Sequence, residues 1–246
     1  MAEEYETERE GKKKNGSPLS RRRFVALTGT TAFLAMAGSA LVGLFSSGPP
    51  AVSEAYAMEG GIGKPKNILI ITGSARVQGN SQLLAEAFAK GAGEAGHTVN
   101  IFHSGRDRMS GCLNCGACWS TGNPCIMSDS FDKLWPLLER ADMLVFSSPL
   151  YMYSYSGHIK NVMDRLYPYT KKSKPRALKI KEAMLLMCCE SWFEKSLAGP
   201  AESYRQMLGY FGWKDRGRLF VTRIHEKGEI AGNSSLKTAE KMGREA

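Results

Sequence analysis

Four of the six cysteines lie close together in the run Cys112-Leu-Asn-Cys115-Gly-Ala-Cys118-Trp-Ser-Thr-Gly-Asn-Pro-Cys125, with the spacing C-x2-C-x2-C-x6-C. Three thiolates two residues apart can wrap one corner of a small cube, and the fourth returns after the turn Gly122-Asn123-Pro124. Four cysteines are the ligand set of a [4Fe–4S] cluster. A zinc ion also takes four thiolates, and disulfides or free thiols are the remaining alternatives. The run therefore predicts a metal centre at Cys112, Cys115, Cys118 and Cys125.

A second segment that could do chemistry is the loop Gly73-Ser-Ala-Arg-Val-Gln-Gly-Asn-Ser81. It follows a short apolar run, Asn67–Thr72, which predicts a buried strand, and a helical pattern follows it. Glycines let the backbone turn tightly and expose N–H groups, and a helix N-terminus attracts anions. The alternative is a plain strand-to-helix turn with a polar cap. The candidate phosphate ligands are Ser74, Arg76, Gly79, Asn80 and Ser81.

Strand and helix patterns alternate five times along residues 66–246, which predicts an α/β fold with a parallel sheet covered on both faces. We expect a flavodoxin-like doubly wound sheet of five strands in the order 2-1-3-4-5, with ligands between the first and third strands. The expected strands are Asn67–Thr72, Thr98–His103, Asp142–Ser147, Ala183–Cys189 and Arg218–Ile224. The expected helices are Asn80–Ala95, Phe131–Arg140, Ser156–Tyr167, Gly199–Phe211 and Ser235–Gly243. Residues 104–130 predict a long loop, which is usually functional inside a compact domain.

The segment Ser147-Ser-Pro-Leu-Tyr-Met-Tyr-Ser154 follows the third strand and offers aromatic faces and a proline that fixes the turn. With the loop at 73–81, it resembles the flavodoxin-like NAD(P)H-dependent FMN reductase family over about residues 66–246. The cysteine spacing resembles the iron–sulfur flavoprotein branch of that family.

The resemblance implies that the loop at 73–81 grips the phosphate of FMN and that the segment after the third strand lies against the isoalloxazine. The implied contacts there are Pro149, Leu150, Tyr151, Met152 and Tyr153. Asp164 and Arg165, in a helix that also matches, are expected to be structural. Cys188 and Cys189 are expected in the core, although with Glu190 and Ser191 they could border the flavin. No catalytic residue is assigned.

Residues 1–57 have the pattern of an export signal with a linker, which leaves residues 58–246 as the FMN-binding domain with its cysteine-rich loop at 110–127. The segment Ser20-Arg21-Arg22-Arg23-Phe24-Val25 resembles a twin-arginine signal. An apolar stretch follows, and Ala55-Tyr56-Ala57 has the small-x-small form that a signal peptidase accepts. A retained membrane anchor is the alternative. We therefore expect an exported protein in the periplasm or at the cell surface.

The chain has 246 residues and a net charge of +9, with 33 Lys and Arg against 24 Asp and Glu. This balance suits an acidic partner or an anionic cofactor, but no aromatic-basic motif accompanies it, so nucleic acid is not expected as a partner. Clustered cysteines argue against a disulfide scaffold over the whole chain.

The leading hypothesis is an exported FMN-dependent oxidoreductase, an iron–sulfur flavoprotein that passes electrons to or from a redox protein, a membrane quinol or a cytochrome. The resemblance implies a homodimer or homotetramer, with the cluster of one subunit near the flavin of another. The cysteine loop is expected at the same sheet edge as the flavin loops. The alternative is an NAD(P)H- or quinol-dependent flavin or quinone reductase whose cysteines are structural. A third hypothesis is a zinc or disulfide binding module that has lost FMN.

Overall fold

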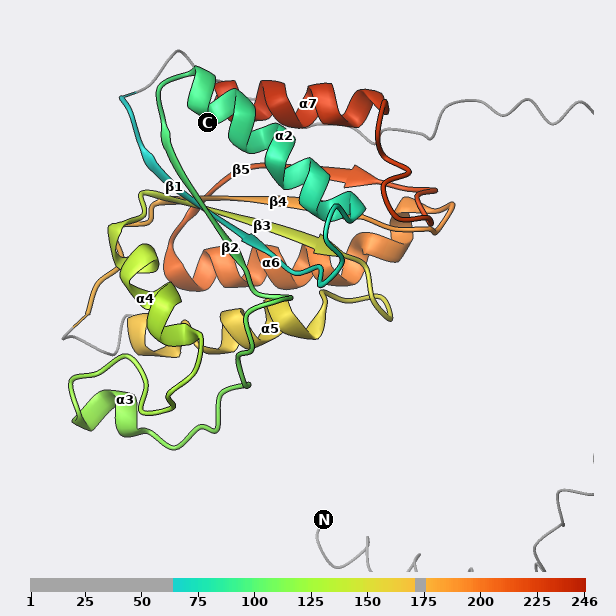
Figure 1. Ribbon diagram of the computed structural model, residues 1–246. Helices are drawn as coiled ribbons and strands as arrows, with labels where there is room; N and C mark the ends of the chain where they lie inside the picture. Colours follow the sequence, from blue (N-terminus) through green and yellow to red (C-terminus); the bar gives the residue numbers. More distant parts are fainter. Residues whose placement is uncertain (1–63, 171–175) are drawn as a thin grey trace, which may run out of the picture. The chain divides into compact units, whose positions relative to one another are not determined.

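Five parallel strands form one sheet in the computed structural model, which describes residues 64–170 and 176–246 (Figure 1). Their order is β2-β1-β3-β4-β5, which confirms the predicted flavodoxin-like topology. The export signal predicted for residues 1–57 lies outside the described residues. The strands are β1 (Asn67–Thr72), β2 (Thr98–His103), β3 (Met143–Pro149), β4 (Glu182–Cys188) and β5 (Lys214–Val221).

Helices cover both faces of this sheet, with α2 and α7 on one face and α4, α5 and α6 on the other (Figure 1). No helix within residues 64–170 and 176–246 has both the length and the apolar character needed to cross a bilayer. The helices are α2 (Asn80–Glu94), α3 (Ala117–Ser120), α4 (Phe131–Arg140), α5 (Gly157–Asp164), α6 (Ala198–Phe211) and α7 (Ser234–Arg244). Two short 3-10 helices are η2 (Tyr167–Tyr169) and η3 (Glu194–Leu197).

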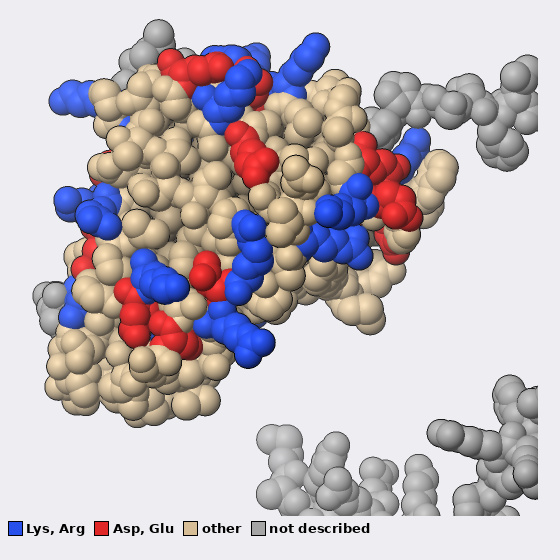
Figure 2. Space-filling view, viewed as in Figure 1, with Lys and Arg blue, Asp and Glu red and all other residues tan. Residues whose placement is uncertain are grey.

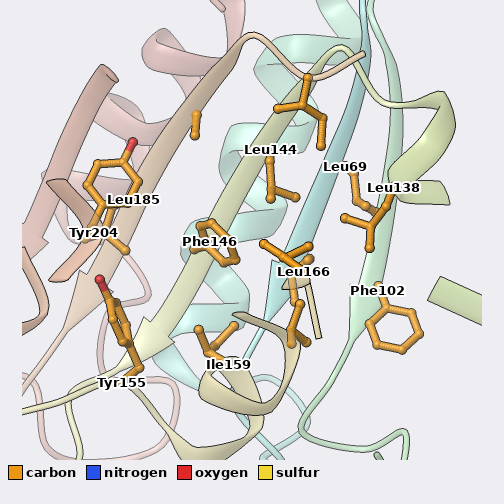
Figure 3. Close-up of a cluster of buried hydrophobic side chains, with 14 of the residues drawn as sticks. Leu69, Phe102, Leu138, Leu144, Phe146, Tyr155, Ile159, Leu166, Leu185 and Tyr204 are labelled. Atoms are coloured by element: carbon orange, nitrogen blue, oxygen red, sulfur yellow. The ribbon is translucent and has the colours of Figure 1, made fainter. Parts of the chain in front are cut away.

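The three central strands, β1, β3 and β4, are mostly apolar because both of their faces are buried, whereas the edge strands β2 and β5 mix polar and apolar residues. Leu69, Leu144 and Leu185 point toward the layer of α4, α5 and α6, where Figure 3 shows them with Tyr204 and other buried side chains. Alternate residues of the same strands, such as Ile70 and Val145, belong to a second core cluster beneath α2 and α7. The period of two along each strand therefore divides the core into two layers.

Two predicted elements have a boundary that differs by more than two residues, and one predicted loop contains a short helix. The strand predicted at Arg218–Ile224 runs instead over Lys214–Val221, because its polar first residues pair with β4 at the sheet edge. The helix predicted at Ser156–Tyr167 ends at Asp164, and η2 with Pro168 follows. The predicted loop at 104–130 contains the short helix α3.

Candidate functional site

A pocket of about 500 Å³, called here the strand-end pocket, opens at the carboxyl ends of the strands. Its volume lies within the range of small-molecule sites. It spans the point where the strand order reverses between β1 and β3, as expected for this topology. All ten residues predicted as cofactor contacts line it: Ser74, Arg76, Gly79, Asn80, Ser81, Pro149, Leu150, Tyr151, Met152 and Tyr153.

The N-terminus of α2 faces this pocket with a buried hydroxyl and backbone N–H groups. Among the residues that the structure describes, no side chain caps the helix, and its first turn holds no acidic residue. Ser81 is 1 % exposed, and its Oγ has no hydrogen-bond partner among the described residues. A buried hydroxyl without a partner is costly, and a helix N-terminus attracts negative charge. These groups fit a phosphate better than they fit a plain turn.

Close backbone packing shapes the loop at 73–81. The Ser74 Oγ accepts a hydrogen bond from the Arg76 N–H at 3.1 Å, which tightens the turn. A Cβ on Gly79 would stand 2.9 Å from that same Oγ. A Cβ on Gly105, just past β2, would stand 2.4 Å from the Ser74 carbonyl carbon. Both glycines are therefore needed for the loop to keep this shape.

Asn80 lines the pocket, but its side chain is engaged elsewhere. Its Nδ2 donates to the Glu226 carbonyl at 2.7 Å, and its Oδ1 accepts from the Ile230 N–H at 3.2 Å. Asn80 thus ties the segment after β5 to the start of α2. The phosphate contact predicted for Asn80 stays a prediction, and the structure adds that this side chain positions the far wall of the pocket.

The segment after β3 makes a tight turn with an unusual backbone. Tyr151 and Ser154 exchange two backbone hydrogen bonds of 2.9 Å, and between them Met152 and Tyr153 have φ values of 46° and 59°. Both angles lie in the left-handed region, where bulky residues are strained. Met152 is nevertheless 92 % exposed. A strained backbone turn that exposes apolar side chains beside a pocket is typical of a ligand-binding segment.

The wall formed by the segments after β4 and β5 was only partly anticipated. Cys188, Cys189, Glu190 and Ser191 do line the pocket. Both cysteines are buried, and burial together with the neighbouring Cys189 raises the pKa of the Cys188 thiol to about 12. Cys188 therefore stays a thiol, which fits a packing role.

His225 and Lys227 also line the pocket, and neither was predicted from the sequence. His225 Nδ1 lies 2.5 Å from a carboxylate oxygen of Glu190, across the ends of β4 and β5. The available signal was position, since His225 directly follows the strand predicted at Arg218–Ile224. A histidine that contacts a carboxylate at a pocket wall is an arrangement that can take part in proton transfer.

A second pocket, called here the cysteine pocket, is lined by Cys112, Cys115, Cys118 and Cys125. The Asn114 N–H points at Cys112 Sγ at 3.4 Å, and the Met127 N–H points at Cys125 Sγ at 3.5 Å. All six cysteines lie in the described residues and none forms a disulfide. Within those residues, no group of three or more His, Cys, Asp or Glu side chains is arranged to hold a metal ion.

The cysteine loop itself carries no charged side chain, and Arg165 is the one charged residue among the described residues that line the pocket. No Lys, Arg, Asp or Glu occurs between Arg108 and Asp129, and Figure 2 shows the lobe around α3 almost without charge. Burial and the three neighbouring cysteines raise the pKa of Cys118. The four cysteines therefore line one pocket whose other described lining residues are mostly apolar or uncharged.

The cysteine pocket does not lie at the same sheet edge as the strand-end pocket, so that expectation was wrong. The loop starts at this edge, with Gly105 against Ser74, and then runs along α5, where Asn161 Nδ2 donates to the Met109 carbonyl at 2.9 Å. The cysteines end beside the residues that follow α5, including Tyr167. Hydrogen bonds to α5 carry the loop away from the strand ends.

Two arginines anchor the cysteine loop. Arg165 Nη1 lies 2.7 Å from a carboxylate oxygen of Asp129 and 3.3 Å from the Ser110 carbonyl. Arg176 bonds the Gly122 carbonyl, and its Nη1 lies 2.9 Å from Glu139. Burial favours the neutral carboxyl of Asp129, but the bonds from Arg165 and two backbone N–H groups prevail and hold its pKa below the usual value.

One family model and several curated proteins match this chain. The family model for NADPH-dependent FMN reductase matches residues 66–223. An iron-sulfur flavoprotein from Archaeoglobus fulgidus is 31 % identical over 99 residues, which cover 40 % of this chain and 44 % of the relative. An iron-sulfur flavoprotein from Methanocaldococcus jannaschii is 29 % identical over 118 residues, covering 47 % of this chain and 58 % of the relative. The chain thus spans about half the length of these curated relatives.

Solved structures share the fold. An NAD(P)H:quinone oxidoreductase from Methanothermobacter marburgensis superposes with a TM-score of 0.59 at 22 % identity, covering 73 % of this chain and 96 % of that one. An azoreductase from Bacillus anthracis superposes with a TM-score of 0.55 at 16 % identity, covering 73 % and 99 %. At these identities the likeness supports the architecture alone.

Proposed function

Because the chain belongs to the NADPH-dependent FMN reductase family, we propose that it is an FMN-dependent oxidoreductase with an iron–sulfur cluster that passes electrons between redox partners. One observation carries the proposal: a single chain presents both a strand-end pocket suited to a phosphorylated ring and a separate hollow with four thiols. The curated relatives named iron-sulfur flavoproteins support the same combination.

The strand-end pocket would hold FMN through its phosphate and its ring. Ser81, Arg76 and the free N–H groups of α2 would bind the phosphate. The strained turn at Met152 and Tyr153 would lie against the ring and exclude water. When bound, FMN accepts electrons in pairs and releases them singly.

The cysteine pocket would hold the cluster through Cys112, Cys115, Cys118 and Cys125. Two backbone N–H groups already point at two of these sulfur atoms. Such bonds and an apolar surrounding are the means by which proteins tune a cluster. When bound, a cluster carries one electron at a time.

The two pockets lie at opposite ends of α5, whose eight residues span about 12 Å. Ser156 caps the N-terminal end, where its Oγ would meet a Cβ on Gly73 beside the strand-end pocket, and the cysteine pocket adjoins the other end. The homodimer or homotetramer that the family resemblance implies, in which the cluster of one subunit approaches the flavin of another, remains part of this proposal.

Analysis of protein purified without oxygen tests the proposal directly. We expect FMN together with about four irons and four sulfides per chain. Cys115→Ser should lose iron and keep the flavin, whereas Ser81→Ala should weaken FMN binding about tenfold and keep the iron. Ser235→Ala is the matched control, because Ser235 is equally buried without a hydroxyl partner but lies on α7 outside the pocket. Stoichiometric zinc, or a colourless protein that takes up no FMN, would contradict the proposal.

A second candidate, reduction of a quinone, is favoured by the Glu190–His225 pair at the pocket. A quinone takes up two protons with its two electrons, and His225 is placed to supply one of them. His225→Asn should slow reduction of a soluble quinone and leave the flavin and iron contents unchanged. Equal rates in the variant and the wild type would remove His225 from the reaction.

We further propose export by the twin-arginine route, on the sequence around Arg21 and Arg22. An extracytoplasmic location favours a membrane quinol, a cytochrome or a redox protein over NAD(P)H as the donor. Replacing both arginines with lysine should retain the precursor in the cytoplasm. Unchanged export of the double variant would overturn the route.

A further inference from the structure

Arg165 is a buried arginine whose donors are only partly used. The residue is 2 % exposed, and Nη1 serves both Asp129 and the Ser110 carbonyl. Its Nε and Nη2 are fully buried and have no hydrogen-bond partner among the described residues. The guanidinium also lies 4.3 Å from the centroid of the Phe131 ring. Buried charged donors left without acceptors are costly, so their position calls for an acceptor that the protein itself does not supply.

The cysteine pocket is where such an acceptor would sit. Among the described residues that line this pocket, Arg165 alone carries a charge. The other lining residues are the four cysteines, apolar side chains and small or uncharged polar groups, including Leu113, Ile126 and Met127. The Arg165 side chain is itself buried, so solvent screens its charge less than it would screen an exposed one, while the ion pair with Asp129 offsets part of that charge.

We propose that Arg165 donates hydrogen bonds to the cluster site and raises the reduction potential of the cluster. This inference rests on the proposed function. An iron–sulfur cluster with four thiolate ligands would be an anion, and one electron received from the reduced flavin of the proposed function would add a further negative charge without breaking a bond. A fixed guanidinium beside the site therefore stabilises the reduced state more than the oxidised state.

The competing explanation is that Arg165 only anchors the loop. Arg176 provides the comparison, because it anchors the same loop through the Gly122 carbonyl and pairs with Glu139. Arg176 does not line the cysteine pocket. A loss of anchoring should therefore affect both variants, whereas a change in potential should follow Arg165 alone.

The test is a redox titration of the cluster in the anaerobically purified full chain, with iron and sulfide content measured on the same samples. Arg165→Gln should lower the equilibrium constant for one-electron reduction at least tenfold, which is a shift of about 59 mV to lower potential. Arg165→Lys should restore most of the shift, because it keeps the charge. Arg176→Gln should leave the potential unchanged.

An unshifted potential in Arg165→Gln with full iron content would overturn the inference, as would an equal shift in Arg176→Gln. If Arg165→Gln loses its iron, the Arg165→Lys variant provides the test instead. An iron content and a reduction potential equal to those of the wild type in Arg165→Lys would support the charge effect. A lysine variant that also loses iron, while Arg176→Gln retains it, overturns that effect. Failure of the proposed function is read separately, from the absence of iron in the wild type, and it also overturns the inference.

Discussion

The strand-end pocket and the cysteine pocket are built in different ways. The first gathers residues from four distant segments, at 74–81, 149–153, 188–196 and 224–227, which meet because the strands before them are neighbours. The second takes its thiols from the single run Cys112–Cys125 and is anchored to the domain by side chains such as Arg165 and Arg176.

This difference separates two sources of order. The strand-end pocket depends on the topology of the sheet, so we expect substitutions that crowd the backbone of its loops to disturb it most. The cysteine pocket depends on a few buried polar anchors, so it should open when one anchor is lost while the sheet remains folded. Local opening of weakly anchored segments below the global free energy of unfolding is common in proteins.

The largest expected effect comes from Asp129→Asn. The change leaves buried Arg165 without its charged partner, which costs about 3–5 kcal/mol in comparable buried pairs. Iron content should fall steeply while flavin remains bound, as measured by metal analysis and absorbance. Asp132→Asn, at an exposed position on α4, should cost less than about 1 kcal/mol. Equal loss of flavin and iron would show that the two pockets are not independent.

Gly105→Ala should weaken FMN binding and leave the iron content unchanged, which is the reverse of the effect of Asp129→Asn. Its new Cβ would stand 2.4 Å from the Ser74 carbonyl carbon, and crowding of this kind costs about 1–3 kcal/mol. We expect FMN affinity to fall at least tenfold with iron retained. The control is Gly157→Ala, where an added Cβ meets nothing within 4 Å. Unchanged FMN affinity in Gly105→Ala would mean that the loop at 73–81 adapts.

Met152→Gly tests the strain in the strand-end pocket. Glycine adopts a φ of 46° without strain, so the free energy of unfolding should rise by about 1 kcal/mol while FMN binding weakens. Urea unfolding and flavin titration measure the two effects. Tyr210→Gly, at an exposed site on α6 with ordinary backbone, should instead lower stability by roughly 0.5 kcal/mol. A destabilised Met152→Gly would contradict the strain argument.

The smallest effect concerns pH. Burial, with help from the positive charge of Arg106, lowers the pKa of His103, which lies 3.0 Å from Thr72 Oγ1 beneath the loop at 73–81. A lowered histidine pKa stabilises the fold fully above about pH 6.5 and loses that contribution as pH falls below it. His103→Gln should therefore show a smaller drop in Tm between about pH 7.5 and pH 5.5 than the wild type. His97, whose pKa burial also lowers, retains its own part of the dependence.

Local patterns predicted much of the fold because they reflect local forces. The strands β1 and β2 and the helix α4 have the bounds read from their apolar periods. The ten predicted cofactor contacts share one pocket because loops after neighbouring parallel strands must meet. The polar start of β5 was missed, because pairing with β4 rather than side-chain pattern holds it in the sheet.

The roles of single side chains were harder to predict. Asn80 has the right type and place for a phosphate ligand, yet it bonds Glu226 and Ile230, about 150 residues away in sequence. His225 meets Glu190 only because β4 and β5 are adjacent. Arg165 was expected to be structural, and the two donors that it leaves unused could be seen only with the loop folded against it.

The amino-acid sequence by itself determined which segments become strands and helices, where polar loops follow strands, and that four thiols stand in one run. Hydrophobic period and cysteine spacing are properties of neighbouring residues, so they can be recognised without knowing the fold. Tertiary structure decided which side chains hydrogen-bond to loops, which hydrogen-bond donors lack a partner among the described residues, and where the cysteine loop lies. Those outcomes depend on contacts between residues far apart in the chain, whose energies exist only once the sheet and its helices have packed.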